Sequence, residues 1–395
     1  MKKSRILALL LALVMCLALA ACGDKTPNED ENGDGDSTAA TLKMGFIGPL
    51  TGPAAQYGQA AMNGAKIAVE EINANGGNIQ IDFQEMDDEH DAEKAMNAYT
   101  QLKDDDAQVI VGCVTTSPCL AIAPTAYADR MFLLTPSASS PTVIQDRDNV
   151  YQLCFSDTSQ GMISAQQIKE QNLATKVAVI YNNADAYSTG IYTAFKEEAE
   201  NLGLELVSET TFTDETATDF SVQLGEAKSK GAELIFLPIY YTPASLILKQ
   251  AAEMQFDVKF FGCDGLDGLL GIDNFDAALA EGVMLLTPFA ADAKDELTTS
   301  FVAKYKEAYN GEIPSQFAAD GYDCVYALYK ACLQSEADIA NLSASEMCDL
   351  MIETFSSEAF TVDGLTGEGM TWKTNGEVSK EPKVFVIQEG AYVPM

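Results

Sequence analysis

The chain has 395 residues, which is too long for one small core, so two domains are expected. Its hydrophobic content of 47% is ordinary for a folded protein, but 59 Asp and Glu stand against 24 Lys and Arg, a net charge of −35. A surface this acidic repels nucleic acid and anionic lipid, which argues against a nucleic-acid-binding role.

The N-terminus carries a segment that is not expected to join the fold. Residues 1–22, MKKSRILALLLALVMCLALAAC, have a basic start, an apolar run and an ending that resembles the lipobox of bacterial lipoproteins. We therefore expect residues 1–21 to be a signal peptide and Cys22 to be lipidated; an ordinary signal peptide and a membrane anchor are the alternatives. Residues 22–40 are polar, acidic and aperiodic, as in a disordered tether.

The cysteine and histidine content argues against metal and triad chemistry. Apart from Cys16 and Cys22, seven cysteines remain, and no two have CxxC spacing. Because an odd number cannot all pair within the chain, we expect several to be buried thiols. The single histidine, His90, lies in a charged run. We expect no metal site, no cofactor and no catalytic triad that uses histidine as its base.

Short apolar runs alternate with helical stretches along the rest of the chain. Ala61, Ala65, Ala68 and Ile72 would share one face of such a helix. This alternation predicts parallel sheets covered by helices on both faces. The predicted strands are 42–48, 79–85, 108–114, 131–135, 176–181, 204–208, 233–239, 258–262 and 282–287.

The series of predicted strands is duplicated, since the first four are echoed by the next four at similar spacings. It predicts an α/β fold of two doubly wound parallel-sheet lobes joined by a hinge that the chain crosses three times. The expected crossings lie near 154–161, 285–289 and 361–367. The lobe segments are then 41–156 and 286–362 for lobe 1, and 157–285 and 363–395 for lobe 2.

Ligands of open α/β sheets bind beyond the carboxyl ends of the strands, so these ends form the candidate site. Three of them carry Ser or Thr before Pro: Ser117-Pro118, Ser140-Pro141 and Thr242-Pro243. This pair suits the N-cap and first turn of a helix, whose free N–H groups could hold a carboxylate without Lys or Arg. The alternative is that each hydroxyl only caps its own helix.

The second predicted lobe offers an acid as the counterpart. In FFGCDGLDG, Asp264 follows a strand and suits an ammonium group; Asp267 is its rival, and a turn role is the alternative for both. Three tyrosines at strand or turn ends, Tyr57, Tyr187 and Tyr241, could line an apolar pocket or belong to the core.

An ordered set of motifs over residues 42–380 resembles the leucine/isoleucine/valine-binding family of periplasmic binding proteins. The motifs are IGPLTGPAAQYG, AVEEINANGG, GCVTTSPCLAIAP, LLTPSASSP and GCDGLDG. Members of this family have the type I periplasmic binding protein fold and are extracytoplasmic receptors of ABC importers, anchored as lipoproteins in Gram-positive bacteria.

The resemblance implies roles for the candidate residues. Ser117, beside Thr116, would bind the ligand carboxylate together with Ser139, which would also face the ammonium group. Ser137 and Ala138 would contribute backbone groups.

By the same resemblance, Asp264 would bind the ammonium group, and Tyr57, Tyr187 and Tyr241 would form an aromatic wall. TTS and PSAS replace the leucine-binding patterns SSS and PAAT, and Pro238-Ile239-Tyr240 replaces small residues, so the identity of the amino acid stays open.

The sequence therefore predicts a lipoprotein, anchored on the outer face of the cell membrane, that binds an amino acid and delivers it to an ABC permease. The expected ligand is a branched-chain amino acid or another hydrophobic amino acid, and the chain is expected to be a monomer. Two alternatives remain: a sensor module for a small amide or acid, and a serine hydrolase using Ser117 or Ser139. The second lacks a G-x-S-x-G motif and a histidine near either serine in the chain.

Overall fold

The computed structural model describes residues 39–335 and 337–395. The expected signal peptide, Cys22 and all but the last two residues of the expected tether lie outside the described residues. Within the described residues, no helix is long and apolar enough to cross a membrane.

A parallel sheet of five strands, in the order β2-β1-β3-β4-β5, forms the first half of the fold. We call this sheet and the helices packed on it lobe 1. Four of its strands were predicted, and the three-residue β5 was not. The strands are β1 (Ala40–Gly48), β2 (Ile79–Asp87), β3 (Val109–Gly112), β4 (Phe132–Thr135) and β5 (Val150–Gln152).

A second sheet, of seven strands in the order β12-β11-β10-β9-β8-β6-β7, defines lobe 2. Read from β7, its first five strands repeat the order of lobe 1, which confirms the predicted duplication. All five predicted strands are present. The strands are β6 (Lys176–Asn182), β7 (Glu205–Phe212), β8 (Leu234–Leu237), β9 (Lys259–Gly262), β10 (Met284–Thr287), β11 (Lys383–Gln388) and β12 (Ala391–Pro394).

The expectation of purely parallel sheets is wrong at one edge of lobe 2. There β11 pairs antiparallel with β10, and β12 pairs antiparallel with β11. Glu389 and Gly390, with φ of 52° and 74°, form the two-residue turn between these strands, a geometry that turns the chain directly back on itself. The hairpin therefore extends the sheet without a crossover helix.

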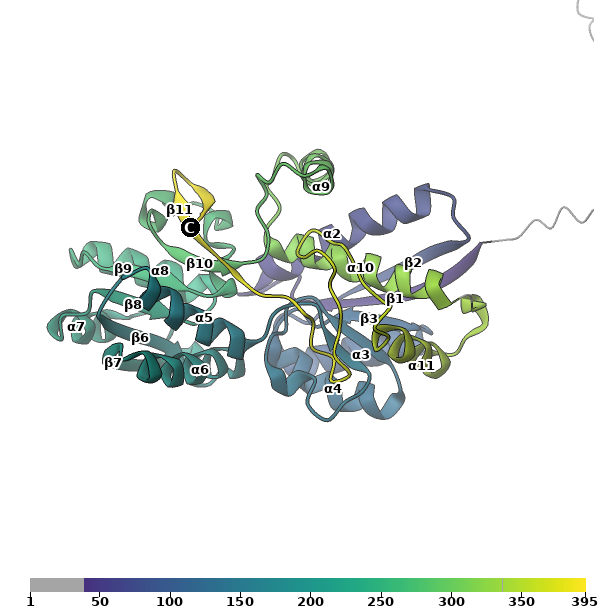
Figure 1. Ribbon diagram of the computed structural model, residues 1–395, viewed down its shortest axis with the longest axis horizontal. Coiled ribbons are helices and arrows are strands. Elements are labelled where there is room, and N and C mark those ends of the chain that lie inside the picture. Colours follow the sequence, from purple (N-terminus) through teal and green to yellow (C-terminus); the bar gives the residue numbers. More distant parts are fainter. Residues whose placement is uncertain (1–38, 336) are drawn as a thin grey trace, which may run out of the picture. The chain divides into compact units, whose positions relative to one another are not determined.

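Helices cover both sheets. In Figure 1, α2, α3, α4, α10 and α11 accompany the strands of lobe 1, and α5, α6, α7 and α8 accompany those of lobe 2. The helices are α2 (Ala55–Ala74), α3 (Ala92–Asp104), α4 (Thr116–Asp129), α5 (Asp157–Glu170), α6 (Ala186–Leu202), α7 (Ser221–Ser229), α8 (Tyr241–Glu253), α9 (Glu296–Ala308), α10 (Gln316–Ser335) and α11 (Ala344–Phe355).

Helices α2 and α10 pack closely because glycines face the partner backbone. A Cβ on Gly64 would lie 1.8 Å from the carbonyl oxygen of Ala318, and one on Gly321 would lie 2.0 Å from that of Ala61. The apolar face predicted for α2 is fully or nearly fully buried. The segment after β10 of lobe 2 thus returns to lobe 1, where α10 joins its core.

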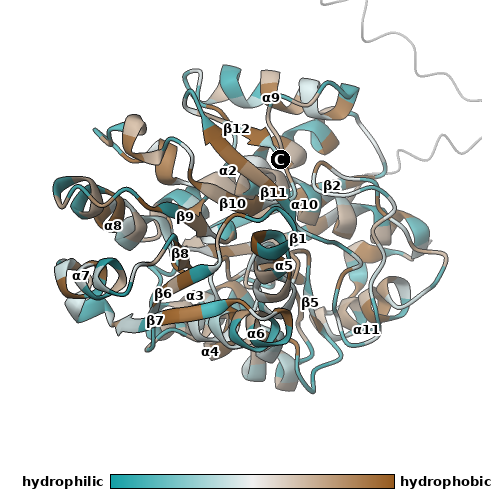
Figure 2. Cartoon of the chain, turned by 60° about the vertical axis from the view of Figure 1, so that its left-hand side comes forward, coloured by the Kyte–Doolittle hydropathy of each residue, from teal (hydrophilic) through white to brown (hydrophobic). Residues whose placement is uncertain are grey.

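In Figure 2 the hydrophobic colour gathers on strands such as β10 and β12, while hydrophilic colour prevails on loops and outer turns.

The last return to lobe 2 lies later than the expected crossing at 361–367. The indole nitrogen of Trp372 donates to the carbonyl oxygen of Gln152 over 2.8 Å, and the amide of Gln152 donates to the carbonyl of Gly376 over 2.9 Å. The chain therefore stays beside β5 of lobe 1 as far as residue 376 before it enters β11.

The seven cysteines within the described residues are all free and buried, as the odd count suggested. Burial raises the pKa of their thiols; that of Cys119, for example, is raised to about 12.

Candidate functional site

The carboxyl ends of the strands in the two lobes meet through Tyr57, near the start of α2. Its hydroxyl donates to the carbonyl oxygen of Gly265 and accepts from the amide of Tyr241 over 3.0 Å. The side chain is 1% exposed. Both partners follow strands of lobe 2, so the loops after β1, β8 and β9 come together where doubly wound sheets bind ligands.

Asp264 lies in this region, in a short 3-10 helix after β9 (Asp264–Leu266). Its Oδ1 accepts from the hydroxyl of Tyr187 over 2.6 Å, and its amide donates to Oε1 of Gln160 over 3.0 Å. Burial raises the pKa of the Asp264 carboxyl to about 6, although the hydrogen bond from Tyr187 opposes the shift. A buried carboxyl of this kind gains from a cationic partner.

Asp267, the rival acid, has a different environment. Its Oδ2 accepts from the amide of Gln316, the first residue of α10, over 2.9 Å. The side-chain amide of Gln316 in turn donates to the carbonyl of Asp264 over 3.1 Å. Asp267 thus caps a helix, and this engagement favours Asp264 as the ligand-binding acid.

An aromatic cluster occupies the space beside Asp264. The ring of Tyr240 stacks on that of Tyr187, with centroids 4.8 Å apart and planes at 7°, and lies 5.6 Å from Tyr57. The rings of His90 and Tyr240 form a T-shaped pair with centroids 5.5 Å apart. Tyr57 also contacts Tyr241, with ring centroids 4.8 Å apart, and Tyr187 joins these rings through Tyr240, which the sequence analysis treated only as a departure from small residues.

Ser139, after β4, is fully buried and donates from its hydroxyl to Oδ1 of Asp157 over 2.7 Å. The amide of Asp157, the first residue of α5, donates to the carbonyl of Ser139 over 3.0 Å. Burial raises the pKa of the Asp157 carboxyl well above its usual range. With its proton directed at Asp157, the Ser139 hydroxyl remains free to accept, a polarity that suits an ammonium group better than a carboxylate.

The backbone of Ser137 and Ala138 is largely engaged within lobe 1. The amide of Ala138 donates to Oγ1 of Thr135 over 2.8 Å, and its carbonyl accepts from the side chain of Gln152 over 2.7 Å. The hydroxyl of Ser137 donates to the carbonyl of Val114 over 2.6 Å. Only the remaining lone pairs of these two residues are available to a ligand.

Helix α4 begins two residues earlier than the Ser117-Pro118 pattern predicted. Thr115 occupies the N-cap position, but its hydroxyl makes no cap bond and lies 2.8 Å from Nδ1 of His90. Thr116 is 1% exposed, and Ser117, partly exposed, is the second helical residue. The free amides of the first turn therefore belong to Thr116 and Ser117, because Pro118 has no N–H and the amide of Cys119 donates to the carbonyl of Thr115.

The other two Ser/Thr-Pro pairs also depart from the prediction. Helix α8 begins at Tyr241 with Tyr240 as its N-cap, so Thr242 is inside the first turn and exposed. Ser140 does precede a 3-10 helix (Pro141–Val143), but its hydroxyl bonds to Thr142 and not to the backbone. Ser117 and Thr242 are therefore not N-cap residues, so the prediction is wrong for these two pairs. Ser140 stands at the N-cap position of its helix, but its side chain makes no cap bond.

Among the residues that the structure describes, the buried polar atoms without a hydrogen-bond partner include four from the residues discussed here: Thr116 Oγ1, Asp157 Oδ2, Gln160 Nε2 and the hydroxyl of Tyr240. Leaving a buried polar group unpaired costs about 1–3 kcal/mol. A bound molecule with matching groups would recover part of this free energy. Sequence reasoning missed Asp157, Gln160 and Tyr240 because their partners lie far away in the chain.

The geometry does not support the hydrolase alternative. Ser139 donates to an acid and not to a base, and His90 pairs with Thr115 and not with either candidate serine. Asp88 accepts from the backbone amide of His90, whereas Nδ1 of the imidazole lies against the Thr115 hydroxyl. Within residues 39–335 and 337–395 there is no cluster of side chains suited to a metal ion.

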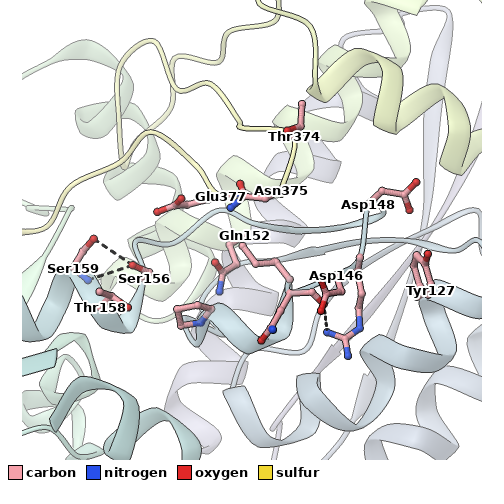
Figure 3. Close-up of a pocket in the computed structure, with 14 residues that line it drawn as sticks. Tyr127, Asp146, Asp148, Gln152, Ser156, Thr158, Ser159, Thr374, Asn375 and Glu377 are labelled. Atoms are coloured by element: carbon pink, nitrogen blue, oxygen red, sulfur yellow. Dashed lines mark hydrogen bonds between the residues drawn. The ribbon is translucent and has the colours of Figure 1, made fainter. Parts of the chain in front are cut away.

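A surface pocket of about 790 Å³ lies elsewhere, between lobe 1 and the start of α5, and contains none of the predicted site residues. Figure 3 shows Ser156, the N-cap of α5, bonded to Ser159 at one end of the pocket. Tyr127 lies at the opposite end of the pocket. Nη1 of its Arg147 already donates to the backbone carbonyls of Thr142, Val143 and Gln145.

Two lobes of repeated strand order, meeting at their carboxyl ends over a buried acid and tyrosines, define a two-lobed binding protein. The chain matches the family model described as periplasmic binding protein over residues 41–388 and belongs to that family.

Among its relatives is the leucine-, isoleucine-, valine-, threonine- and alanine-binding protein of Pseudomonas aeruginosa, 28% identical over 280 residues, 68% of this chain and 73% of that protein. A solved structure of the branched-chain amino acid transporter substrate-binding protein LivJ from Streptococcus pneumoniae, in complex with isoleucine, is 28% identical. It has a TM-score of 0.80 and covers 89% of this chain and 97% of its own. The leucine-binding protein LivK of Thermotoga maritima is 26% identical with a TM-score of 0.79, covering 90% and 97%.

Proposed function

We propose that this protein is the extracytoplasmic substrate-binding lipoprotein of an ABC importer and that it binds an amino acid between its two lobes. The observation that carries the proposal is the buried Asp264 of lobe 2, next to Gly265, whose carbonyl accepts from the hydroxyl of Tyr57 in lobe 1, in a protein whose relatives are named as amino-acid-binding proteins.

The ammonium group of the ligand is assigned to Asp264. The carboxyl is 4% exposed, and burial raises its pKa to about 6. An ammonium group beside it would favour the ionised form and supply hydrogen bonds of the stronger, charge-assisted kind. Ser139, whose proton is directed at Asp157, could accept from the same ammonium group.

The carboxylate of the ligand is assigned to the start of α4, at Thr116 and Ser117. The first amides of a 14-residue helix are free donors and carry the positive end of its dipole. Oγ1 of Thr116, buried and without a partner, adds a hydroxyl donor. This arrangement would replace the Lys or Arg that an isolated anion usually requires.

A zwitterion needs both halves of this site because each polar group buried without a partner costs roughly 2–7 kcal/mol. We therefore propose that the two lobes close over the ligand and that the closed form is presented to a membrane permease. Tyr57, which bonds to lobe 2, would stabilise that form. Lipid anchoring at Cys22 would hold a monomer at the outer face of the cell membrane.

Titration calorimetry of the full chain with the twenty amino acids tests the proposal. We expect at least one to bind with clear heat, and Asp264→Asn to weaken it roughly 10- to 150-fold, since a hydrogen bond to a charged group is lost and its partner is left buried. Asp257→Asn, which removes an exposed carboxyl just before the same strand, is the matched control. Weak and equal heats for all amino acids, or undiminished binding by the Asp264 variant, would refute the proposal.

A further inference from the structure

The four unpartnered atoms around the site differ in what surrounds them. Thr116 Oγ1 belongs to the helix start that was assigned to the ligand carboxylate, and Gln160 is bonded to the backbone of Asp264. Asp157 Oδ2 faces α6, since a Cβ on Gly190 would lie 2.9 Å from it. The hydroxyl of Tyr240 is the atom left over once both ends of a zwitterion have been matched.

Tyr240 is held in place by residues of both lobes. Its ring stacks on Tyr187 of lobe 2 and contacts Tyr57 and His90 of lobe 1. It also provides the N-cap residue of α8, whose backbone is extended there. The ring is therefore fixed between the assigned ammonium partner, reached through Tyr187, and the start of α4, reached through His90 and Thr115.

The surroundings of the Tyr240 hydroxyl are polar. Burial raises its pKa well above the ordinary tyrosine value, and the carboxyls of Asp185 and Asp157 raise it further. His90, in edge contact with the ring, bonds to the hydroxyl of Thr115. An aliphatic side chain placed here would cover these groups without bonding to any of them, whereas a hydroxyl or amide would pair with one.

We infer that Tyr240 forms the side-chain end of the ligand site, and that its hydroxyl selects amino acids with a short hydrogen-bonding side chain over aliphatic ones of the same shape. This inference rests on the proposed function. It names a different ligand class from the branched-chain amino acids, and its physical basis is that a hydroxyl left unpaired by the wrong ligand penalises that ligand.

Isosteric pairs of amino acids test the inference: threonine against valine, and asparagine against leucine. Calorimetry on the full chain should show the polar member of a pair binding roughly 5- to 150-fold more tightly. Tyr240→Phe keeps the ring and removes only the hydroxyl. It should bring the two members of each pair within about threefold, mainly by weakening the polar one.

Tyr181→Phe is the matched control because Tyr181 also stacks on a tyrosine of α6, Tyr192, with centroids 3.9 Å apart. It should leave the preference unchanged. Equal or tighter binding of valine and leucine by the unaltered chain would overturn the inference while leaving the proposed function intact. A preference that survives in Tyr240→Phe would also overturn it and indicate that another group selects the polar side chain. If no amino acid binds at all, the proposed function itself fails.

Discussion

The hydroxyl of Tyr57 in lobe 1 donates to the carbonyl oxygen of Gly265 in lobe 2, across 208 positions of sequence. The Tyr57 hydroxyl oxygen also accepts from the backbone amide of Tyr241, so a single side chain of lobe 1 bonds to the loops after two strands of lobe 2. These contacts exist only when the lobes are together, and they should contribute to closure and hence to ligand affinity.

Tyr57→Phe should therefore weaken ligand binding by roughly 5- to 15-fold, the equivalent of about 1–1.5 kcal/mol for the lost hydrogen bonding. Its fold should be unaffected because the ring remains. Tyr151→Phe is the control, since Tyr151 is equally buried but bonds to Ser356 within lobe 1. Calorimetry with the tightest-binding amino acid measures both; equal effects of the two substitutions would contradict a closure role for Tyr57.

Gly265→Ala should impair binding and thermal stability together. A Cβ at this position would lie 2.6 Å from the hydroxyl of Tyr187 and 2.8 Å from the carbonyl of Ile239. The Tyr187 contact is the one that holds Asp264, so the displacement would reach the proposed ammonium site. We expect a loss of roughly 1–3 kcal/mol in stability, as for other overpacked positions.

Gly225→Ala is the opposite case, because nothing lies within 4 Å of a Cβ added at this position of α7. It should be neutral or stabilise the protein by up to about 1 kcal/mol. Thermal unfolding and ligand titration of the two variants measure the difference. Unchanged binding by Gly265→Ala would show that the loop after β9 tolerates movement.

Ligand affinity should fall as the pH is lowered through about 6. The raised pKa of Asp264 means that in the empty site this carboxyl is mostly protonated at pH 5, and a proton must leave before it pairs with an ammonium group. The expected loss is about tenfold for each pH unit below the pKa. Calorimetry at pH 5 and 7.5 measures it; a flat profile in the unaltered chain would contradict the assignment.

The same group acts in the opposite direction on the stability of the empty protein. A carboxyl whose pKa is higher folded than unfolded binds its proton more tightly in the folded state, so its contribution favours folding at low pH and is lost as pH rises to about 6. The difference in melting temperature between Asp264→Asn and the unaltered, ligand-free chain should therefore grow in favour of the variant from pH 4 to pH 7. A constant difference would argue against a titrating Asp264.

Lys380→Met should destabilise the protein by about 3–5 kcal/mol. Nζ of Lys380 donates to Asp320 over 3.1 Å and to Thr366 over 2.6 Å, and both charged side chains are at most 3% exposed. Removing the cation would leave a buried acid unpaired. Lys373→Met, which breaks the exposed pair with Glu377, should change the stability by less than about 1 kcal/mol.

Urea unfolding measures these effects, and the double variant Lys380→Met with Asp320→Leu provides the decisive comparison. Because it removes both charges, it should be more stable than Lys380→Met alone. If the double variant were less stable than either single one, the two residues would not act as a pair.

Local pattern was enough to predict the repeated strands, because each is a short apolar run that buries itself in the sheet. It failed at β5, which has three residues, and at the β11–β12 hairpin, where the antiparallel pairing depends on a turn at Glu389 and Gly390. The starts of α4 and α8 were predicted too late because a proline in the first turn has no amide that needs a partner, so the helix can begin before it.

The candidate site was predictable in its residue types more than in its contacts. An acid between small residues after a strand, and tyrosines at strand ends, led to Asp264, Tyr57 and Tyr187. Nothing local marks Gln160, whose partner Asp264 lies 104 positions away, or the central place of Tyr240. Such contacts arise only when the two lobes meet.

The buried thiols allow local opening of this protein to be measured by alkylation. Cys263 lies in the core of lobe 2 next to Asp264, and Cys113 and Cys119 lie in the core of lobe 1, so an alkylating reagent can modify each only when its own lobe opens. Alkylation of Cys263 therefore follows the opening of lobe 2, and alkylation of the other two follows the opening of lobe 1. The chain thus reports separately on the stability of each lobe, without any introduced label.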